Sequence, residues 1–168
     1  MIRVLLYQTK NHYWWDKLVH AVTGSWYYHA ALWIDGYIYE ETAYFDKNKN
    51  WISGARKRKS GLEGDIYKLI DDAIVDEERV RDWAEQMIRI NEPYNFPLLI
   101  AMPIIYPLRW LWRILNWSPF NLAVFGDICS SFVDKSLKAG GIDLLPEQNE
   151  RYTTPGDIAK SEILEQEG

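Results

Sequence analysis

The chain has 168 residues, of which 48% are hydrophobic and 26% are charged. These are the proportions of a globular protein large enough to enclose a core, and we expect residues 1–168 to form one domain. A net charge of −5 argues against a general nucleic-acid binder, and a single cysteine, Cys129, excludes an intramolecular disulfide and a cysteine-based metal cluster.

The first 15 residues, MIRVLLYQTKNHYWW, contain a short apolar run and no cleavage site of small residues. We therefore expect no secretion signal and a cytoplasmic location, which the lone cysteine also suits. Residues 3–8 in this stretch predict a strand. Residues 14–22, WWDKLVHAV, place apolar side chains at helical spacing and predict a helix that ends at Gly24.

The next stretch, HAALWIDGYIYEET, contains two β-rich runs separated by Asp-Gly at positions 35–36, the strongest short-range signal of a β-hairpin. A two-residue turn at these positions would place Ala31 opposite Glu40. It would also place His29, at the start of the first strand, opposite Thr42. Because paired residues share a face, these four side chains would point the same way.

On that face Glu40 lies diagonal to His29, in a geometry in which a carboxylate can orient an imidazole. The structural alternative is a histidine at a strand end packed beside a surface glutamate. The choice of Glu40 depends on the turn, because one additional loop residue would bring Glu41 to this face instead.

Two further strands are predicted at residues 51–59 and 64–70, followed by an amphipathic helix at residues 76–90 that must end before Pro93. The basic run at 56–59, RKRK, suits an edge strand in contact with solvent, and contact with phosphate or anionic lipid is the alternative. The apolar positions of the helix define its buried side, namely Val80, Trp83, Ala84, Met87 and Ile88.

Residues 97–117, PLLIAMPIIYPLRWLWRILNW, form an apolar block that proline and arginine interrupt too often to predict a membrane span. One interpretation is a helical insertion, over about residues 95–125, that completes the core or covers the substrate cleft. The other is a peripheral membrane contact through Arg109, Trp110, Trp112 and Arg113. Strands come mostly early in the chain and helices mostly late, which predicts the α+β class.

Residues 127–139 predict a helix that ends at Gly-Gly, positions 140–141. Asp127 is the expected N-cap, which places Cys129 in the first turn. There the helix dipole and the backbone N–H groups lower the pKa of a thiol and can bind an oxyanion. The charge of Asp127 opposes thiolate formation, so reactivity would require a nearby histidine. The alternative is a cysteine that serves as a small buried hydrophobe.

Cys129, His29 and Glu40 together are the parts of a cysteine–histidine–acid site, with the chain order reversed relative to papain-type enzymes. The segments that carry these residues resemble the circularly permuted NlpC/P60 proteins, the permuted papain-like amidases of the YaeF/YiiX group. The matching segments are LVHAVTGSWYYHAALWIDGYIYEET, INEPYNFPLL, ICSSFVDKSLKAGGIDLLP and TTPGDIAKSE. The hairpin is also similar to that of lecithin retinol acyltransferase relatives, in which a second histidine stands at the position of Glu40.

The resemblance implies a small antiparallel sheet packed on the helix that carries Cys129, with the site between them. It implies that Cys129 is the nucleophile, His29 the general base and Glu40 the third member. We therefore expect a papain-like thiol hydrolase or acyltransferase that acts on an amide or ester through an acyl-enzyme, without a metal or organic cofactor. Cell-wall peptide amides are the substrates that the resemblance implies, and acyl lipids are the second class, favoured by the apolar block.

The sequence leaves two other classes of function open. A non-catalytic module of this fold would hold a lipid or a protein partner on its aromatic surface, with Cys129 as inert packing. A membrane-associated structural protein would bind vesicles through Arg109 and Arg113.

Overall fold

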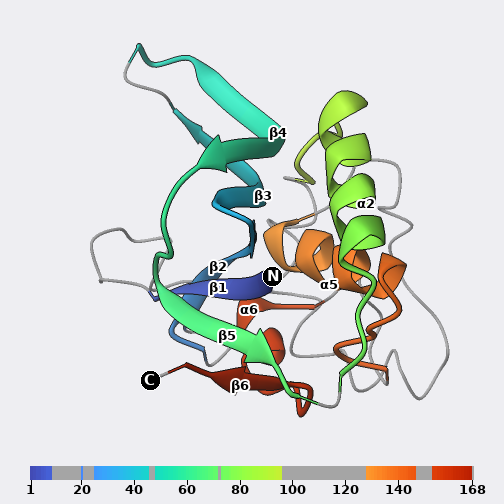
Figure 1. The fold of residues 1–168 in the computed structure, drawn as a ribbon. Helices are drawn as coiled ribbons and strands as arrows, with labels where there is room; N and C mark the ends of the chain where they lie inside the picture. The colour runs from blue at the N-terminus through green and yellow to red at the C-terminus, as the bar shows by residue number, and fades with distance from the viewer. Residues whose placement is uncertain are drawn as a thin grey trace, which may run out of the picture.

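The computed structural model of the protein describes residues 1–8, 20, 25–45, 48–71, 73–95, 128–146 and 153–167. In this part of the chain, a curved six-stranded sheet carries helices α2 (Glu77–Arg89) and α5 (Cys129–Ala139) on one side (Figure 1). A short helix, α6 (Pro155–Ile158), lies beside the sheet. The protein is therefore of the α+β class, as predicted from the order of its elements.

The sheet has the order β4-β3-β2-β1-β5-β6, and all its neighbouring strands are antiparallel. The predicted strands are confirmed, and the basic run lies on β4, an edge strand of the described sheet, as expected. Strand β6 was not predicted, because its three residues, which pair with β5, are too few to show a hydrophobic period. The strands are β1 (Ile2–Gln8), β2 (Tyr27–Ile34), β3 (Tyr37–Phe45), β4 (Trp51–Lys59), β5 (Asp65–Leu69) and β6 (Leu164–Gln166).

The turn between β2 and β3 is the predicted two-residue turn. Asp35 and Gly36 have φ values of 48° and 87°, which are the positive values that a tight hairpin turn of the favoured twist requires. The three predicted pairs next to the turn are present, namely Ile34 with Tyr37, Trp33 with Ile38 and Leu32 with Tyr39.

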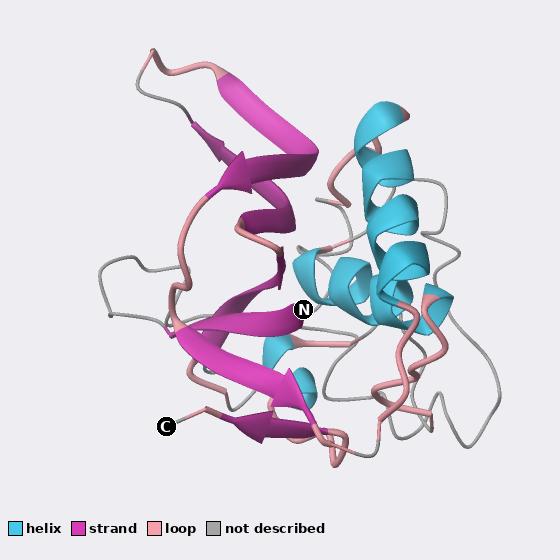
Figure 2. Cartoon of the chain, viewed as in Figure 1, coloured by secondary structure: helices cyan, strands magenta, loops and turns pink. Residues whose placement is uncertain are grey.

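Beyond these three pairs the two strands diverge. Within the described residues, β2 continues along β1, whereas β3 pairs with β4 over its whole length (Figure 2). The predicted pairs of Ala31 with Glu40 and of His29 with Thr42 are therefore wrong. Helix α5 packs against both β2 and β3, and each strand forms its ladder with its other neighbour.

The main core lies between the sheet and the helices. Alternate residues of β1 and β2 point toward α5, because successive side chains of a strand face opposite sides of a sheet. This core is nearly inaccessible to solvent, and it includes Val4, Leu6, Ala30, Leu32 and Ile34 from the sheet and Phe132, Val133 and Leu137 from α5.

Helix α2 closes the same core from the side of β4. It begins after Asp76, whose Oδ1 accepts a hydrogen bond from the backbone N–H of Arg79 at 3.1 Å. Val80 and Ala84 are completely buried, and the Trp83 ring lies 5.5 Å from that of Phe132. The predicted buried side of this helix is confirmed, since Trp83, Met87 and Ile88 all pack against the core.

A smaller apolar cluster occupies the opposite face of the sheet. It consists of Leu5, Ala31 and Ile38, with Tyr7 and Trp33 packed against it. His29 of β2 and Glu40 of β3 share this face, since each lies two residues from a member of the cluster.

Of the helices in the described part of the chain, none combines the length and the apolar character needed to cross a bilayer.

Several predicted features lie outside the described residues. They are the helix at 14–22 apart from His20, the apolar block at 97–117 with Arg109, Trp110, Trp112 and Arg113, and Asp127.

Candidate active site

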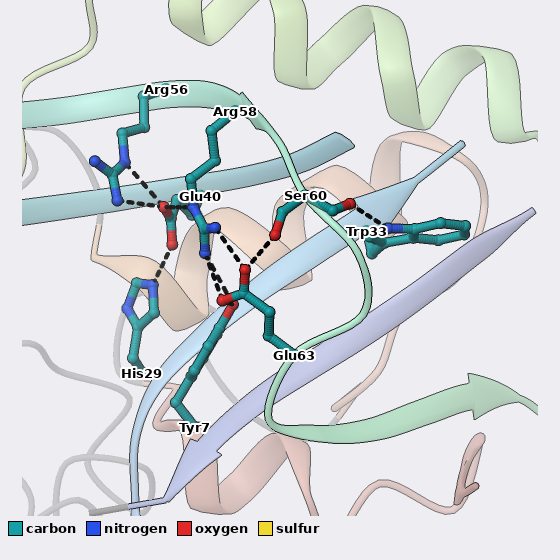
Figure 3. Close-up of polar contacts among 8 residues, drawn as sticks. All are labelled: Tyr7, His29, Trp33, Glu40, Arg56, Arg58, Ser60 and Glu63. Carbon is teal, nitrogen blue, oxygen red and sulfur yellow. Dashed lines mark hydrogen bonds and ion pairs between the residues drawn. The ribbon is translucent and has the colours of Figure 1, made fainter. Parts of the chain in front are cut away.

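His29 and Glu40 are in direct contact. The Nε2 atom of His29 lies 2.8 Å from Oε2 of Glu40 (Figure 3). The Glu40 side chain is only 3% exposed and that of His29 is 16% exposed. Glu41, the alternative that a longer turn would have selected, alternates with Glu40 along the strand and is completely buried on the opposite face of the sheet.

A β-bulge precedes His29 in β2. Tyr7 of β1 pairs with His29, but the next residue, Gln8, pairs with Tyr27, so Tyr28 is an additional residue on β2. Bulges of this kind redirect the side chains next to them and occur often beside active sites. The ring of Tyr7 lies 5.3 Å from the imidazole, which is therefore held between an aromatic ring and a carboxylate.

Two arginines of β4 bind the other oxygen of Glu40. Arg56 donates from Nε at 2.8 Å and from Nη2 at 2.5 Å to Oε1, and Arg58 donates from Nε to the same atom at 3.0 Å. Burial raises the pKa of Glu40, but the bonds to His29 and the arginines outweigh it and hold this pKa at about 2. Glu40 is thus a fixed anion whose Oε1 binds the two arginines and whose Oε2 binds the imidazole.

A second carboxylate extends the network. Glu63 binds Nη1 and Nη2 of Arg58 at 2.8 and 3.0 Å and also accepts a hydrogen bond from the Ser60 hydroxyl. The Tyr7 hydroxyl lies 3.3 Å from Nη2 of Arg58 (Figure 3). This role of the basic run was not predicted, although alternation along a strand places Arg56 and Arg58 on one face.

The helix that carries Cys129 begins at that residue. Its N-cap is Ile128, so the predicted cap, Asp127, is wrong. Isoleucine has no side-chain acceptor, and instead the Ser131 hydroxyl oxygen accepts a hydrogen bond from the backbone N–H of Ile128 at 3.3 Å. The first turn of α5 contains no acidic residue, so no carboxylate of that turn opposes a thiolate.

Cys129 and His29 alter each other's pKa. Burial raises the pKa of Cys129, but the charge of His29, a hydrogen bond with it, and the backbone of Ala30 and Ser130 lower it below its usual value. Burial lowers the pKa of His29, whereas interactions with Cys129 and Glu40 raise it to about 9. Because the thiol pKa falls and the imidazole pKa rises, the arrangement favours a thiolate–imidazolium pair.

Tyr94 is a further polar neighbour of Cys129. Burial, the charges of Cys129 and Glu41, and a hydrogen bond with Cys129 raise the pKa of Tyr94 well above its usual value. The phenol therefore keeps its proton and can donate it in a hydrogen bond. The turn that carries Tyr94 is held against β4, since the backbone N–H of Ala55 donates to the carbonyl of Glu92 at 3.3 Å. The sequence signal for this residue was the INEPYNFPLL segment, to which we assigned no side-chain role.

The structure thus brings together all three predicted members of the site, Cys129, His29 and Glu40. Among the described residues, no group of three or more histidine, cysteine, aspartate or glutamate side chains is placed to hold a metal ion. Comparison of the chain with protein-family models, with curated proteins and with solved structures found no match.

Proposed function

We propose that the protein is a cysteine-dependent hydrolase or acyltransferase of the permuted papain-like type, acting on an amide or ester. The observation that carries this proposal is the placement of His29. It contacts Glu40 through Nε2, and it interacts with Cys129 through a hydrogen bond and through its charge. The neighbouring strands β2 and β3 supply His29 and Glu40, and helix α5, far along the chain, supplies Cys129.

In the resting enzyme the thiol proton resides on His29. The Cys129 thiolate attacks the carbonyl carbon of the substrate and forms a tetrahedral intermediate. When this intermediate collapses, the imidazolium gives its proton to the departing amine or alcohol, and the acyl group stays on sulfur. The neutral imidazole then takes a proton from water, or from an acceptor amine or alcohol, as that group attacks the thioester, and the thiolate is released.

Two groups are suited to stabilise the oxyanion of the intermediate. The backbone N–H of Cys129 lies in the first turn of α5, where helix N–H groups have no intrahelical partner. The Tyr94 hydroxyl, which stays protonated beside Cys129, is the second donor.

Glu40 acts by orientation and charge. Its Oε2 fixes the imidazole through Nε2, which leaves Nδ1 for proton exchange with Cys129. Arg56 and Arg58 hold Glu40 ionised and immobile, so that it favours the imidazolium without taking its proton.

The proposed substrates are peptide amides of the cell-wall type or acyl lipids. Two aromatic side chains near the start of β2 are accessible to a ligand, since Trp26 is 52% and Tyr28 is 44% exposed. Aromatic faces bind both apolar chains and sugar or peptide backbones, so this surface suits either class.

The first experiment is the rate of iodoacetamide alkylation as a function of pH, for wild type and for His29→Ala. The chain has one cysteine, so every alkylation event reports on Cys129. We expect rapid alkylation of the wild type well below pH 8.5, about the pKa of a free thiol, and loss of this reactivity in the variant.

A second experiment tests turnover with p-nitrophenyl acetate. The expected result is a burst of one p-nitrophenolate per chain and an acetyl group on Cys129 by mass spectrometry, both absent in Cys129→Ala. If Cys129→Ala released p-nitrophenolate as fast as wild type, or if His29→Ala left the alkylation profile unchanged, the proposed mechanism would be wrong.

A non-catalytic binding module is the second candidate, and the exposed aromatic side chains Trp26, Tyr28 and Trp51 favour it. In that case Cys129 would resist alkylation until the protein unfolds, and Cys129→Ala would bind lipid vesicles or peptides as wild type does.

A further inference from the structure

The segment of residues 153–157 touches the nucleophile helix at the residue after Cys129. The hydroxyl of Ser130 donates to the backbone carbonyl of Thr153 at 2.5 Å, and both residues are completely buried. One turn later on α5, Asp134 accepts a hydrogen bond from the Thr153 hydroxyl at 3.4 Å. These two bonds join the segment to the first two turns of α5.

The same segment is internally rigid. The backbone N–H and the hydroxyl of Thr154 donate to Oδ2 of Asp157 at 3.0 and 2.7 Å, and the N–H of Asp157 donates back to the Thr154 hydroxyl oxygen at 3.2 Å. This reciprocal capping box surrounds Pro155, whose ring fixes its φ angle. Both capping side chains are buried, and their reciprocal bonds tie the segment together.

On its other side the segment contacts the chain that leads into β2. A Cβ atom placed on Gly156 would lie 2.3 Å from Cβ and 2.4 Å from Oγ of Ser25. The Ser25 hydroxyl oxygen in turn accepts a hydrogen bond at 3.0 Å from the backbone N–H of Tyr27, the first residue of β2. Two residues after Tyr27 comes His29.

We propose that residues 153–157 are a positioning segment that sets the separation of Cys129 and His29, with the Ser130–Thr153 bond and the Gly156–Ser25 contact as its two ends. The proposal rests on the proposed thiol mechanism and names residues that act on it without touching the reacting atoms. The φ angle of Gly156 lies outside the left-handed region, so backbone conformation does not require glycine at this position. The lack of space beside Ser25 does.

The size of the effect follows from the contact distances. Ordinary Cβ contacts begin near 3.4 Å, so a methyl group at position 156 requires the segment and Ser25 to separate by about 1 Å. Because the segment is bonded to α5, part of that displacement reaches Cys129. A misplacement of this size reduces the rate of a step that depends on alignment by about a hundredfold, and partial relaxation lowers this to about tenfold.

The test is a rescue experiment on the full chain. Alkylation of Cys129 by iodoacetamide is measured against pH, together with the thermal midpoint, in wild type, Gly156→Ala, Ser25→Gly and the double variant. For Gly156→Ala we expect alkylation at pH 6 to be about tenfold slower. We also expect the midpoint of the pH profile of alkylation to shift toward the free-thiol pKa of about 8.5. In the double variant, where Ser25 no longer has the atoms that clash, we expect the profile of Ser25→Gly to return, since both variants lack the bond between the Ser25 hydroxyl and Tyr27.

Matched controls separate positioning from stability. Gly61→Ala adds a methyl group where no atom lies within 4 Å and should change nothing. Should Gly156→Ala fail to fold, Ser130→Ala removes the other end of the segment. It is compared with Ser136→Ala, which loses a bond at 2.6 Å to the carbonyl of Phe132 within the helix itself. We expect only Ser130→Ala to shift the alkylation profile.

The outcomes distinguish this inference from the function on which it rests. A lower thermal midpoint with an unchanged alkylation profile in Gly156→Ala would overturn the positioning role while leaving the proposed function intact. A folded double variant without rescue would also overturn it. If wild type itself showed no accelerated alkylation below pH 8, about the free-thiol range, the proposed function would fail, and the inference with it.

Discussion

Replacement of Glu40 by glutamine is expected to destabilise the protein in a pH-dependent manner. The pKa of Glu40 falls from 4.5 to about 2 on folding, and each unit corresponds to about 1.4 kcal/mol. The ionised carboxylate therefore contributes about 3 kcal/mol to the free energy of unfolding at neutral pH. Because the folded pKa is the lower one, this contribution is complete above pH 4.5 and is lost as the pH falls toward 2.

The contribution remaining at pH 3 follows from the same two pKa values and is about 1 kcal/mol. We expect urea unfolding, followed by tryptophan fluorescence, to give a difference between wild type and Glu40→Gln of about 3 kcal/mol at pH 7 and about 1 kcal/mol at pH 3. Glutamine keeps the size of the side chain, so packing is nearly unchanged and the loss reflects charge.

Glu63→Gln is the matched control. The pKa of Glu63 is also lowered to about 2, first by its bond to Arg58, but its side chain is 37% exposed whereas that of Glu40 is 3% exposed. Solvent screens such a pair, and we expect Glu63→Gln to lose less than about 1 kcal/mol. Equal losses in the two variants, or a loss in Glu40→Gln that does not change with pH, would refute the reasoning.

Three further predictions concern the fold and the site. Asp76→Ala removes the N-cap of α2 and should lower the free energy of unfolding by about 1 kcal/mol in urea titrations, with Asp76→Asn nearly unaffected. Phe132→Ala removes a completely buried ring packed on Trp83 and should cost about 3–5 kcal/mol in the same assay, and a loss near zero would contradict the described core. Tyr94→Phe should slow acylation by p-nitrophenyl acetate by about a hundredfold and, because the hydrogen bond with Cys129 is lost as well, shift the pH profile of Cys129 alkylation to higher pH; equal acylation rates would exclude the hydroxyl as an oxyanion donor.

The sequence was a sufficient guide wherever structure depends on neighbouring residues. The Asp-Gly turn at 35–36 requires positive φ values that these residues tolerate, and the structure has them. The limits of α2 were predicted because its N-cap and its apolar spacing are encoded within a few positions. The same reasoning selected Glu40 over Glu41 as the partner of His29, since the side-chain period of a strand is two.

The errors arose where a distant element intervened. The hairpin pairing stops after three pairs, β2 and β3 continue along β1 and β4, and α5 packs against both; nothing in the sequence of the hairpin encodes these partners. The cap of α5 is a different case: it is Ile128, not Asp127, and the local bond from the Ile128 N–H to the Ser131 hydroxyl oxygen replaces the carboxylate cap that the sequence predicts.

The sequence by itself determined the kinds of chemical group in this protein: one thiol at a helix start, one imidazole on a strand and a carboxylate within reach. Only the tertiary structure decided how those groups are tuned, through Arg56 and Arg58 on Glu40 and through Tyr94 beside Cys129. The physical reason is that a pKa depends on burial and on charges within a few ångströms. Those neighbours come from strands and helices whose relative placement is set by the packing of the whole core.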